Sequence, residues 1–172
     1  IIEYLVEKKK LKGKIVQSVS LGRLPARIAA ARGLAFEELP VGFKYVAEKL
    51  ASGEAVMGAE ESGGYAWKGG LPERDGLITA LLLMEMCVSR NLTPSAIWKG
   101  IEEKYGKSAF IRTDYKMDKP IPNKHSFAVK LKKRLPKTII GRKVTDTNTI
   151  DGLKIILDND SWLLMRPSGT EP

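Results

Sequence analysis

The sequence has 172 residues, which bounds it to one large domain or two small ones. Hydrophobic residues make up 43% of it, enough apolar material for a packed core, which excludes an intrinsically disordered tail. Lys and Arg total 29 against 20 Asp and Glu, and the formal net charge of +9 favours an anionic partner without defining a fold.

The only cysteine, Cys87, excludes an internal disulfide framework and any metal site built from several cysteines. It stands in an apolar run, so we expect it to be buried as a small hydrophobic side chain. The longest apolar run, Leu77 to Val88, is shorter than the roughly 20 residues that span a bilayer. The first ten residues lack the order of a signal peptide. We therefore expect a cytoplasmic protein with no membrane partner.

The first part of the chain alternates between helical and strand patterns. The expected elements, in chain order, are a helix around Ile2 to Val6, a strand at Ile15 to Val19, a helix around Leu24 to Ala31, a strand at Ala35 to Glu38, a helix at Phe43 to Leu50, a strand at Ala55 to Ala59, a helix at Leu77 to Arg90 and a helix from Thr93-Pro94 to Gly106. Asp75 is expected to cap the seventh of these. Such alternation predicts a layered α/β domain over residues 1–109, with helices packed on a mostly parallel or mixed sheet.

The pattern changes near Ala109, after a short hinge. We expect a strand at Phe110 to Tyr115, a helix capped by Ser126 that carries Phe127, Leu131 and Leu135, and strands at Lys143 to Thr147, Leu153 to Leu157 and Trp162 to Met165. Asp151-Gly152 and Asn159-Asp160 lie between the last three apolar runs, as in β-hairpins. Residues 110–172 are therefore expected to form a small α+β domain with an antiparallel sheet.

A glycine-rich acidic loop, Gly58 to Gly64, follows the third expected strand of the first domain. In open α/β sheets, ligands bind beyond the carboxyl ends of the strands. Carboxylates and a hydroxyl on such a loop can hydrogen-bond vicinal sugar hydroxyls, and the glycines permit a close approach. An exposed polar turn with no ligand is the alternative interpretation.

The segment Val41-Gly42-Phe43-Lys44 opens an expected helix. Backbone N–H groups at a helix start, together with the Lys44 ammonium, suit a phosphate group. The alternative is a solvated lysine in the first turn of an ordinary helix.

The segment from Arg166 to Pro172 follows the last expected strand and reads Arg-Pro-Ser-Gly-Thr-Glu-Pro. The guanidinium of Arg166, the hydroxyls of Ser168 and Thr170 and the unobstructed N–H of Gly169 together form a candidate phosphate cradle without a Walker lysine. This is the most specific of the three motifs, because a plain turn rarely needs these residue types so close together.

Two basic runs, Lys8 to Lys14 and Lys130 to Lys137, could bind nucleic acid. Their lysines are spaced around leucines as on the solvated face of a helix, and no aromatic residues stand between them to stack on bases. We therefore expect no nucleic-acid partner. His125 has no second histidine or cysteine beside it, and Asp158-Asn159-Asp160 stands in an expected turn where its role is structural. We therefore expect no metal bound by this chain. No serine stands in an activated nucleophile setting, so we assign no catalytic residue.

Taken together and in this order, these motifs resemble the C-terminal half of the α-D-phosphohexomutases, the phosphoglucomutase/phosphomannomutase family. The resemblance rests on Val41 to Lys44, the Gly58 to Gly64 loop, Glu73-Arg74-Asp75-Gly76 and Arg166 to Pro172, and it covers nearly the whole chain. It implies that residues 1–109 are similar to the third of four domains, which holds the sugar. It likewise implies that residues 110–172 are similar to part of the fourth domain, which holds phosphate.

The resemblance implies an isomerase that interconverts hexose 1-phosphate and hexose 6-phosphate through a phosphoserine and a bisphosphate intermediate. Glu60 and Ser62 would contact the sugar, and the implied phosphate ligands are Arg166, Ser168, Gly169, Thr170 and Lys44. The phosphorylated serine and the Mg²⁺ loop of the family would lie in missing N-terminal domains, so this chain alone is expected to be inactive. Ala59 stands where the family often has glycine.

Two other functional classes stay open at this point. One is a free-standing module that binds sugar phosphates without catalysis, and the other is a basic nucleic-acid-binding protein. The sequence does not distinguish glucose, mannose and glucosamine phosphates as substrates. Because the chain starts without Met and stops inside the Arg166 loop, we expect it to be a piece of a longer protein.

Overall fold

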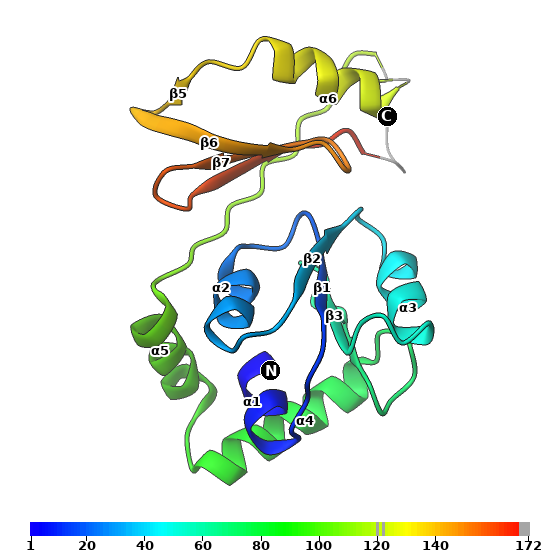
Figure 1. The fold of residues 1–172 in the computed structure, drawn as a ribbon, viewed down its shortest axis with the longest axis vertical. Helices are drawn as coiled ribbons and strands as arrows, with labels where there is room; N and C mark the ends of the chain where they lie inside the picture. Colours follow the sequence, from blue (N-terminus) through cyan, green and yellow to red (C-terminus); the bar gives the residue numbers. More distant parts are fainter. Residues whose placement is uncertain (120, 122, 169–172) are drawn as a thin grey trace. The chain divides into compact units, whose positions relative to one another are not determined.

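The computed structural model describes residues 1–119, 121 and 123–168. The chain divides into two compact units, Ile1–Phe110 and Ile111–Pro172, and each is described by itself (Figure 1). The first is an α/β unit and the second is built around an antiparallel sheet. The predicted fold class is therefore confirmed.

The sheet of the first unit has the strand order β2-β1-β3-β4. Its strands are β1 (Ile15–Ser18), β2 (Phe36–Leu39), β3 (Met57–Ala59) and β4 (Tyr65–Trp67). β1 pairs in parallel with both β2 and β3, and β4 returns antiparallel to β3. The sheet is thus mixed, and the carboxyl ends of its three parallel strands lie at one edge.

Helices cover both faces of this sheet (Figure 1). They are α1 (Ile2–Lys8), α2 (Leu24–Ala31), α3 (Phe43–Ala51), α4 (Gly76–Arg90) and α5 (Pro94–Tyr105). Successive side chains of a strand point to opposite faces, so Ile15 packs with residues of α1, α2, α4 and α5, whereas Val16 packs with α3. Two apolar clusters result, one on each face of the sheet.

Gly58 allows α3 to lie very close to β3. A Cβ atom added at this position would stand 2.1 Å from Cγ1 of Val46 and 3.0 Å from Cγ2 of Val16. Any larger residue would therefore push α3 off the strand. This contact places the first turn of α3 beside the loop that follows β3.

α4 and α5 begin after the residues that the sequence indicated, Asp75 and Thr93. Oδ1 of Asp75 accepts a hydrogen bond from the N–H of Ile78 (3.0 Å), and Oγ1 of Thr93 accepts one from the N–H of Ala96 (3.3 Å). Both side chains satisfy N–H groups that the first helical turn leaves without partners. The predicted cap of α4 is confirmed.

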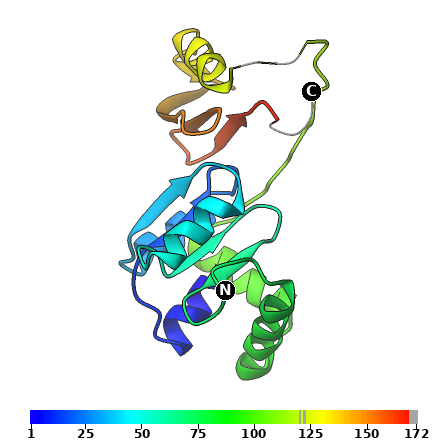
Figure 2. The same ribbon diagram turned by 90° about the vertical axis from the view of Figure 1, so that its right-hand side faces the viewer.

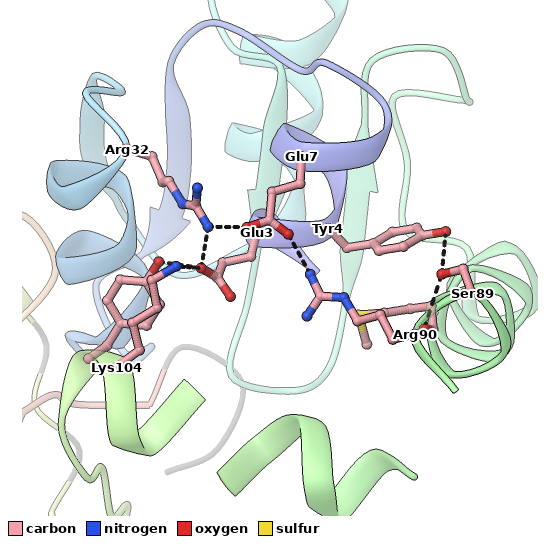
Figure 3. A network of polar contacts seen from close by, with 9 residues as sticks. Glu3, Tyr4, Glu7, Arg32, Ser89, Arg90 and Lys104 are labelled. Carbon is pink, nitrogen blue, oxygen red and sulfur yellow. Dashed lines mark hydrogen bonds and ion pairs between the residues drawn. The ribbon is translucent and has the colours of Figure 1, made fainter. Parts of the chain in front are cut away.

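A network of charged side chains joins α1 to three other helices (Figure 3). Glu3 is buried and accepts hydrogen bonds from Arg32 (2.5 Å), Lys104 (2.6 Å) and the hydroxyl of Tyr105. Glu7 pairs with Arg32 and with Arg90. Burial by itself raises the pKa of Glu3, but the hydrogen bonds from Lys104, Tyr105 and Arg32 lower it to about 2.

The second unit packs one helix, α6 (Lys124–Lys133), on a four-stranded antiparallel sheet. The strands follow in the order β5 (Thr138–Ile139), β6 (Arg142–Asn148), β7 (Leu153–Leu157) and β8 (Trp162–Met165). Leu153, Ile155 and Leu157 alternate along β7 and form the core together with Ala128 of α6. Both predicted hairpin turns occur where expected, between β6 and β7 and between β7 and β8.

Three local expectations are corrected, and two short strands are new. The strand expected at Phe110 to Tyr115 is wrong: this segment is irregular, because no neighbouring strand pairs with it, and Ile111 and Tyr115 face solvent. Asn123, not Ser126, caps α6, since its Oδ1 accepts from the N–H of Ser126. Cys87 is half-buried at the edge of a core cluster, not fully buried. The short strands β4 and β5 were not predicted.

Within the described residues, no single helix has both the length and the apolar composition needed to cross a membrane. α4 and α5 meet those two criteria only as a pair, and they are bent by 80° at the break between them.

Candidate functional site

Three connections of the first unit emerge at the carboxyl edge of its parallel strands. They are residues 19–23 after β1, residues 40–42 after β2 and residues 60–64 after β3. Because β1, β2 and β3 run in parallel, these segments meet at the same edge, where open α/β sheets bind their ligands. The glycine-rich loop singled out in the sequence is therefore at the expected position.

This loop is a tight turn between β3 and β4. The N–H of Glu60 donates to the carbonyl of Gly64 (2.9 Å), and the N–H of Gly63 donates to the carbonyl of Glu60 (3.2 Å). Gly63 has a φ of +84°, a left-handed conformation that favours glycine. These two backbone hydrogen bonds close the turn between β3 and β4.

Glu60 has a buried carboxylate with two partners from other segments. Its side chain is enclosed, and the residue is only 4% exposed. Oε1 accepts a hydrogen bond from the N–H of Gly42 at the start of α3 (2.8 Å), and Oε2 lies 3.6 Å from Nη1 of Arg74. The loop after β3, the first turn of α3 and the segment before α4 therefore converge on one carboxylate.

Arg74 lies beside the Glu60 carboxylate, where these three segments meet. The sequence analysis assigned no binding role to this residue. Its guanidinium carbon stands 5.9 Å from the centre of the Phe43 ring. A Cβ atom at Gly64 would be 3.2 Å from Cδ of Arg74, so the glycine makes room for this side chain. The signal available in the sequence was the charged segment directly before the α4 cap.

A hollow of about 290 Å³ opens beside Arg74, close to the lower limit of about 300 Å³ for small-molecule sites. Its lining consists of Ser62, Gly63, Gly64, Tyr65, Arg74, Asp75 and Gly76. The residues of this lining with polar side chains are Ser62, Tyr65, Arg74 and Asp75, a set that can hydrogen-bond a polyhydroxylated ligand.

Glu61 points to different partners from those of its neighbour Glu60. Its Oε2 accepts hydrogen bonds from Ser18 (3.1 Å) and Ser20 (2.5 Å), two buried serines at the end of β1. The two adjacent carboxylates thus attach the loop to two different parts of the unit, Glu60 to α3 and Glu61 to the end of β1.

Lys44 lies in the first turn of α3, with its side chain exposed. Its ammonium stands 4.9 Å from the centre of the Tyr45 ring and does not line the hollow. The N–H of Gly42, which the sequence suggested for phosphate, donates to Glu60 instead. Of the sequence-predicted residues, Ser62 lines the hollow with Arg74, Glu60 is buried behind it and 3.6 Å from Arg74, and Lys44 is at the surface.

The phosphate motif of the second unit begins where β8 ends. Nε of Arg166 donates to Oδ2 of Asp151 at 2.8 Å, and both side chains are largely buried. This pair fixes the arginine at the base of the motif, while its two Nη groups carry further donors. Ser168 is exposed. Gly169 and Thr170, the other two proposed phosphate ligands, lie outside the described residues.

Metal binding requires a group of carboxylate, imidazole or thiolate ligands close together. Among residues 1–119, 121 and 123–168, no group of three or more His, Cys, Asp or Glu could hold a metal ion. The described residues therefore do not fit a Mg²⁺ site.

Comparison with known proteins identifies the class to which this α/β unit and its loops belong. Residues 1–105 match the family model described as phosphoglucomutase/phosphomannomutase, alpha/beta/alpha domain III. The chain therefore belongs to the phosphoglucomutase/phosphomannomutase family.

Individual relatives carry several substrate names. The chain is 31% identical to a phosphoglucomutase of Komagataeibacter xylinus, over 92% of this chain and 30% of that protein. It is 28% identical to a phosphoglucosamine/phosphogalactosamine mutase of Sulfurisphaera tokodaii, over 92% of this chain and 32% of that protein. The chain spans about a third of the length of the curated relatives it matches.

Solved structures show the same architecture. A Thermus thermophilus protein assigned as a phosphomannomutase superposes with a TM-score of 0.73 at 28% identity, over 94% of this chain and 32% of its own. The phosphoglucomutase parafusin from Paramecium, in its open form, has a TM-score of 0.70 at 20% identity, over 91% of this chain and 30% of its own. The second likeness concerns the fold alone.

Proposed function

We propose that this chain is the substrate-recognition part of a phosphohexomutase, an isomerase that interconverts hexose 1-phosphate and hexose 6-phosphate. The observation that supports it best is the buried Glu60 carboxylate, which accepts from the N–H of Gly42 and lies 3.6 Å from Arg74, a residue that lines the hollow together with Ser62. A carboxylate held by two donors keeps lone pairs free to accept hydrogen bonds from sugar hydroxyls. Family membership gives the reaction class.

The division of labour follows from the chemistry of the two units. In the proposed reaction a phosphoserine elsewhere in the enzyme donates its phosphoryl group to a hexose monophosphate, and the resulting bisphosphate reorients. The other phosphoryl group then returns to the serine. Glu60 and Ser62 would hold sugar hydroxyls, while Arg166, with Ser168, Gly169 and Thr170, would hold the phosphate that is not transferred. Holding remote parts of a substrate lowers the barrier by fixing its orientation.

Two basic side chains, Arg74 and Lys44, would add positive charge near the bound hexose phosphate. Arg74 faces the hollow directly, and we propose it as a further sugar-phosphate contact in addition to the residues that the sequence indicated. Lys44, exposed at the start of α3, would contribute positive charge from the rim. Mg²⁺ would offset charge on the moving phosphoryl group from a site outside the described residues of this chain.

The proposed substrate class is a hexose phosphate of the glucose, mannose or glucosamine type. The relatives bear names for glucose, mannose, glucosamine and galactosamine phosphates. The loop from Glu60 to Gly64 offers carboxylate and hydroxyl groups that can hydrogen-bond sugars which differ at carbon 2.

Amide resonances of the 172-residue chain provide a direct test. Glucose 1-phosphate should shift the amides of Glu60 to Gly64, whereas inorganic phosphate at the same ionic strength should leave that loop unshifted. Glu60→Gln should weaken the sugar-dependent shifts. The control Glu54→Gln alters an exposed carboxylate paired with Lys49 and should change nothing at the loop.

Unshifted loop amides at saturating glucose 1-phosphate would overturn the proposal. Binding to a DNA duplex provides a second criterion, because the affinity for nucleic acid falls steeply with log salt concentration. Steep salt dependence of duplex binding, combined with no response to hexose phosphates, would replace the mutase interpretation by a nucleic-acid function.

A further inference from the structure

The second unit contains a lysine that is completely buried. Lys154 lies in β7 and has an exposed fraction of 0%. Its ammonium stands 4.8 Å from the centre of the Trp162 ring, as in a cation–π contact. Burying an ammonium costs free energy, and lysine is rarely enclosed in this way. The apolar core of this unit, to which β7 contributes Leu153, Ile155 and Leu157, does not need this charge.

Lys154 lies on the face of the sheet opposite α6. The helix packs on one face of this sheet (Figures 1 and 2), where Leu153 and Ile155 of β7 join its core cluster. Because side chains alternate along a strand, Lys154 belongs to the other face. Trp162 shares that face, since it pairs with Ile156 across β7 and β8. The lysine and the aromatic ring are therefore neighbours on the same surface of the sheet.

Arg166 belongs to the same face, one residue pair further along the hairpin. Lys154 pairs with Leu164, so two residues later Arg166 stands opposite Gly152. The two chains are close at this point: a Cβ atom added at Gly152 would lie 3.1 Å from Cβ of Arg166. Residues opposite each other in an antiparallel pair share a face, and diagonal neighbours lie about 7–8 Å apart. Lys154 and Arg166 are diagonal neighbours of this kind.

We propose that the buried ammonium of Lys154 is a second fixed positive charge of the phosphate motif, which attracts the bound phosphate together with Arg166. This inference rests on the proposed function, because it assumes that Arg166 binds phosphate. Two cations at neighbouring positions repel each other, and an anion bound near both adds an attraction to each of them. Burial strengthens that attraction, because salt and water screen an enclosed charge less than an exposed one. The ammonium therefore acts on the phosphate without touching it.

Enclosure distinguishes Lys154 from the other lysines of this unit. Lys130 of α6, for example, is exposed, so its side chain moves freely and its charge is screened by solvent. The position of Lys154 is fixed when the unit folds, and Asp151 fixes Arg166 in the same way by accepting from its Nε at 2.8 Å. Groups that are already ordered lose little entropy when a ligand binds. The two cations are therefore arranged for an anion in advance.

NMR titration of the 172-residue chain with inorganic phosphate tests the inference. In the wild type, phosphate should shift the Nε–H resonance of Arg166 and also the Nζ resonance of Lys154. Lys154→Met should weaken the phosphate affinity about fivefold. Lys154→Arg should restore most of it, because the charge returns. The control Lys130→Met removes the same charge from an exposed position of α6 and should leave the affinity unchanged.

The unfolding temperature separates this role from a purely structural one. Methionine is about as long as lysine, and its sulfur can also contact the Trp162 ring. Replacing a buried charge by an apolar side chain of similar volume is often neutral or stabilising. The Lys154→Met variant should therefore unfold at the wild-type temperature or above it while its phosphate affinity falls. A lower unfolding temperature together with an unchanged phosphate affinity would show that Lys154 only supports the fold, and would overturn the inference.

Two further results would also overturn it. One is an Nζ resonance of Lys154 that stays in place at saturating phosphate, whether or not Arg166 responds. This measurement uses the wild type and so remains decisive if Lys154→Met does not fold. The other is a Lys154→Arg variant that binds phosphate as weakly as Lys154→Met. Failure of the proposed function has a different signature, because it leaves the amides of Glu60 to Gly64 unshifted by glucose 1-phosphate.

Discussion

Glu60 and Glu61 are adjacent in the chain but lie in different environments. Glu60 is buried beside Arg74 and the start of α3, and Glu61 accepts hydrogen bonds from two serines of the β1 end. The same substitution at the two positions should therefore have different consequences. At Glu60 it removes charge next to the hollow, and at Glu61 it weakens a contact that attaches the loop to the sheet.

In the full-length enzyme we expect Glu60→Gln to reduce kcat/KM more than Glu61→Gln. The amide keeps the shape and one oxygen for the N–H of Gly42, but it loses the charge that strengthens hydrogen bonds, which are worth about 1.5–3 kcal/mol when one partner is charged. Glu61→Gln should act mainly on stability, measured by urea unfolding. A larger kinetic loss in Glu61→Gln would contradict this assignment.

Arg166 pairs with Asp151 through Nε, and a lysine could not make this contact and still offer further donors to the proposed phosphate. Its Nε is engaged with Asp151, so a phosphate would be held by the Nη groups of the same planar guanidinium. In the full-length enzyme, Arg166→Lys should weaken substrate use by about 1.5–3 kcal/mol of transition-state binding. Steady-state kinetics with glucose 1-phosphate measure this loss. Kinetic constants equal to those of the wild type would show that this loop does not bind phosphate.

At the scale of an element, the position of α3 depends on the absence of a side chain at Gly58 of β3. Gly58→Ala would place a methyl group 2.1 Å from Val46, so the helix must move away from β3. We expect a loss of about 1–3 kcal/mol in the free energy of unfolding, measured by urea denaturation of the 172-residue chain. Gly100→Ala in α5 is the control, because nothing lies within 4 Å of its Cβ position.

The glycine control should gain rather than lose stability, by up to about 1 kcal/mol, because alanine favours a helix. A Val46→Ala substitution added to Gly58→Ala should restore part of the lost stability by opening space for the methyl group. Equal stabilities of Gly58→Ala and the wild type would mean that α3 does not pack as described.

The charged network that joins α1 to α2, α4 and α5 makes the stability of the first unit depend on pH. The folded-state pKa of Glu3 is about 2, below its ordinary value of 4.5, so the unfolded chain binds more protons in acid. The stabilisation is complete above about pH 5 and should be lost progressively as the pH falls toward 2. Thermal unfolding monitored by circular dichroism between these pH values measures the dependence.

Glu3→Gln provides the comparison for this pH dependence. The variant should be less stable at pH 7, by about 1–3 kcal/mol, because Arg32 and Lys104 lose their charged partner. Its stability should also fall less between pH 5 and pH 2 than that of the wild type. Parallel pH curves for the two proteins would assign the acid sensitivity to other carboxylates.

At the scale of the whole molecule, we expect the 172-residue chain to have no mutase activity. Phosphoryl transfer requires a nucleophile to carry the phosphoryl group and a metal to offset its charge. The sequence has no serine in an activated nucleophile setting, and the described residues contain no group of three or more His, Cys, Asp or Glu that could hold a metal ion. The purified chain, incubated with glucose 1-phosphate, Mg²⁺ and a bisphosphate primer, should form no glucose 6-phosphate. Turnover above the blank that Arg166→Ala abolishes would mean that a nucleophile lies within the chain.

Local sequence patterns were sufficient to predict most helices and strands, because capping residues and apolar periodicity act over a few residues of the chain. The caps at Asp75 and Thr93 act on N–H groups three residues away, and the apolar residues Leu153, Ile155 and Leu157 of β7 alternate so that they join one core cluster. The strand expected at Phe110 to Tyr115 shows the limit of this reasoning. Its residues suit a strand, but no neighbouring strand pairs with them, and pairing is a property of the tertiary structure.

For the candidate site too, some features could be predicted from the sequence and others depended on the tertiary structure. The sequence alone placed a glycine-rich acidic loop at the end of a parallel strand, predicted both hairpins of the second unit and identified the family by its motifs. Only the tertiary structure brought Arg74 to the buried carboxylate of Glu60, turned Glu61 toward the end of β1 and left apolar residues of α4 such as Leu77 and Val88 exposed. Hydrophobic periodicity and capping act between near neighbours in the chain, whereas these contacts depend on how strands and helices pack.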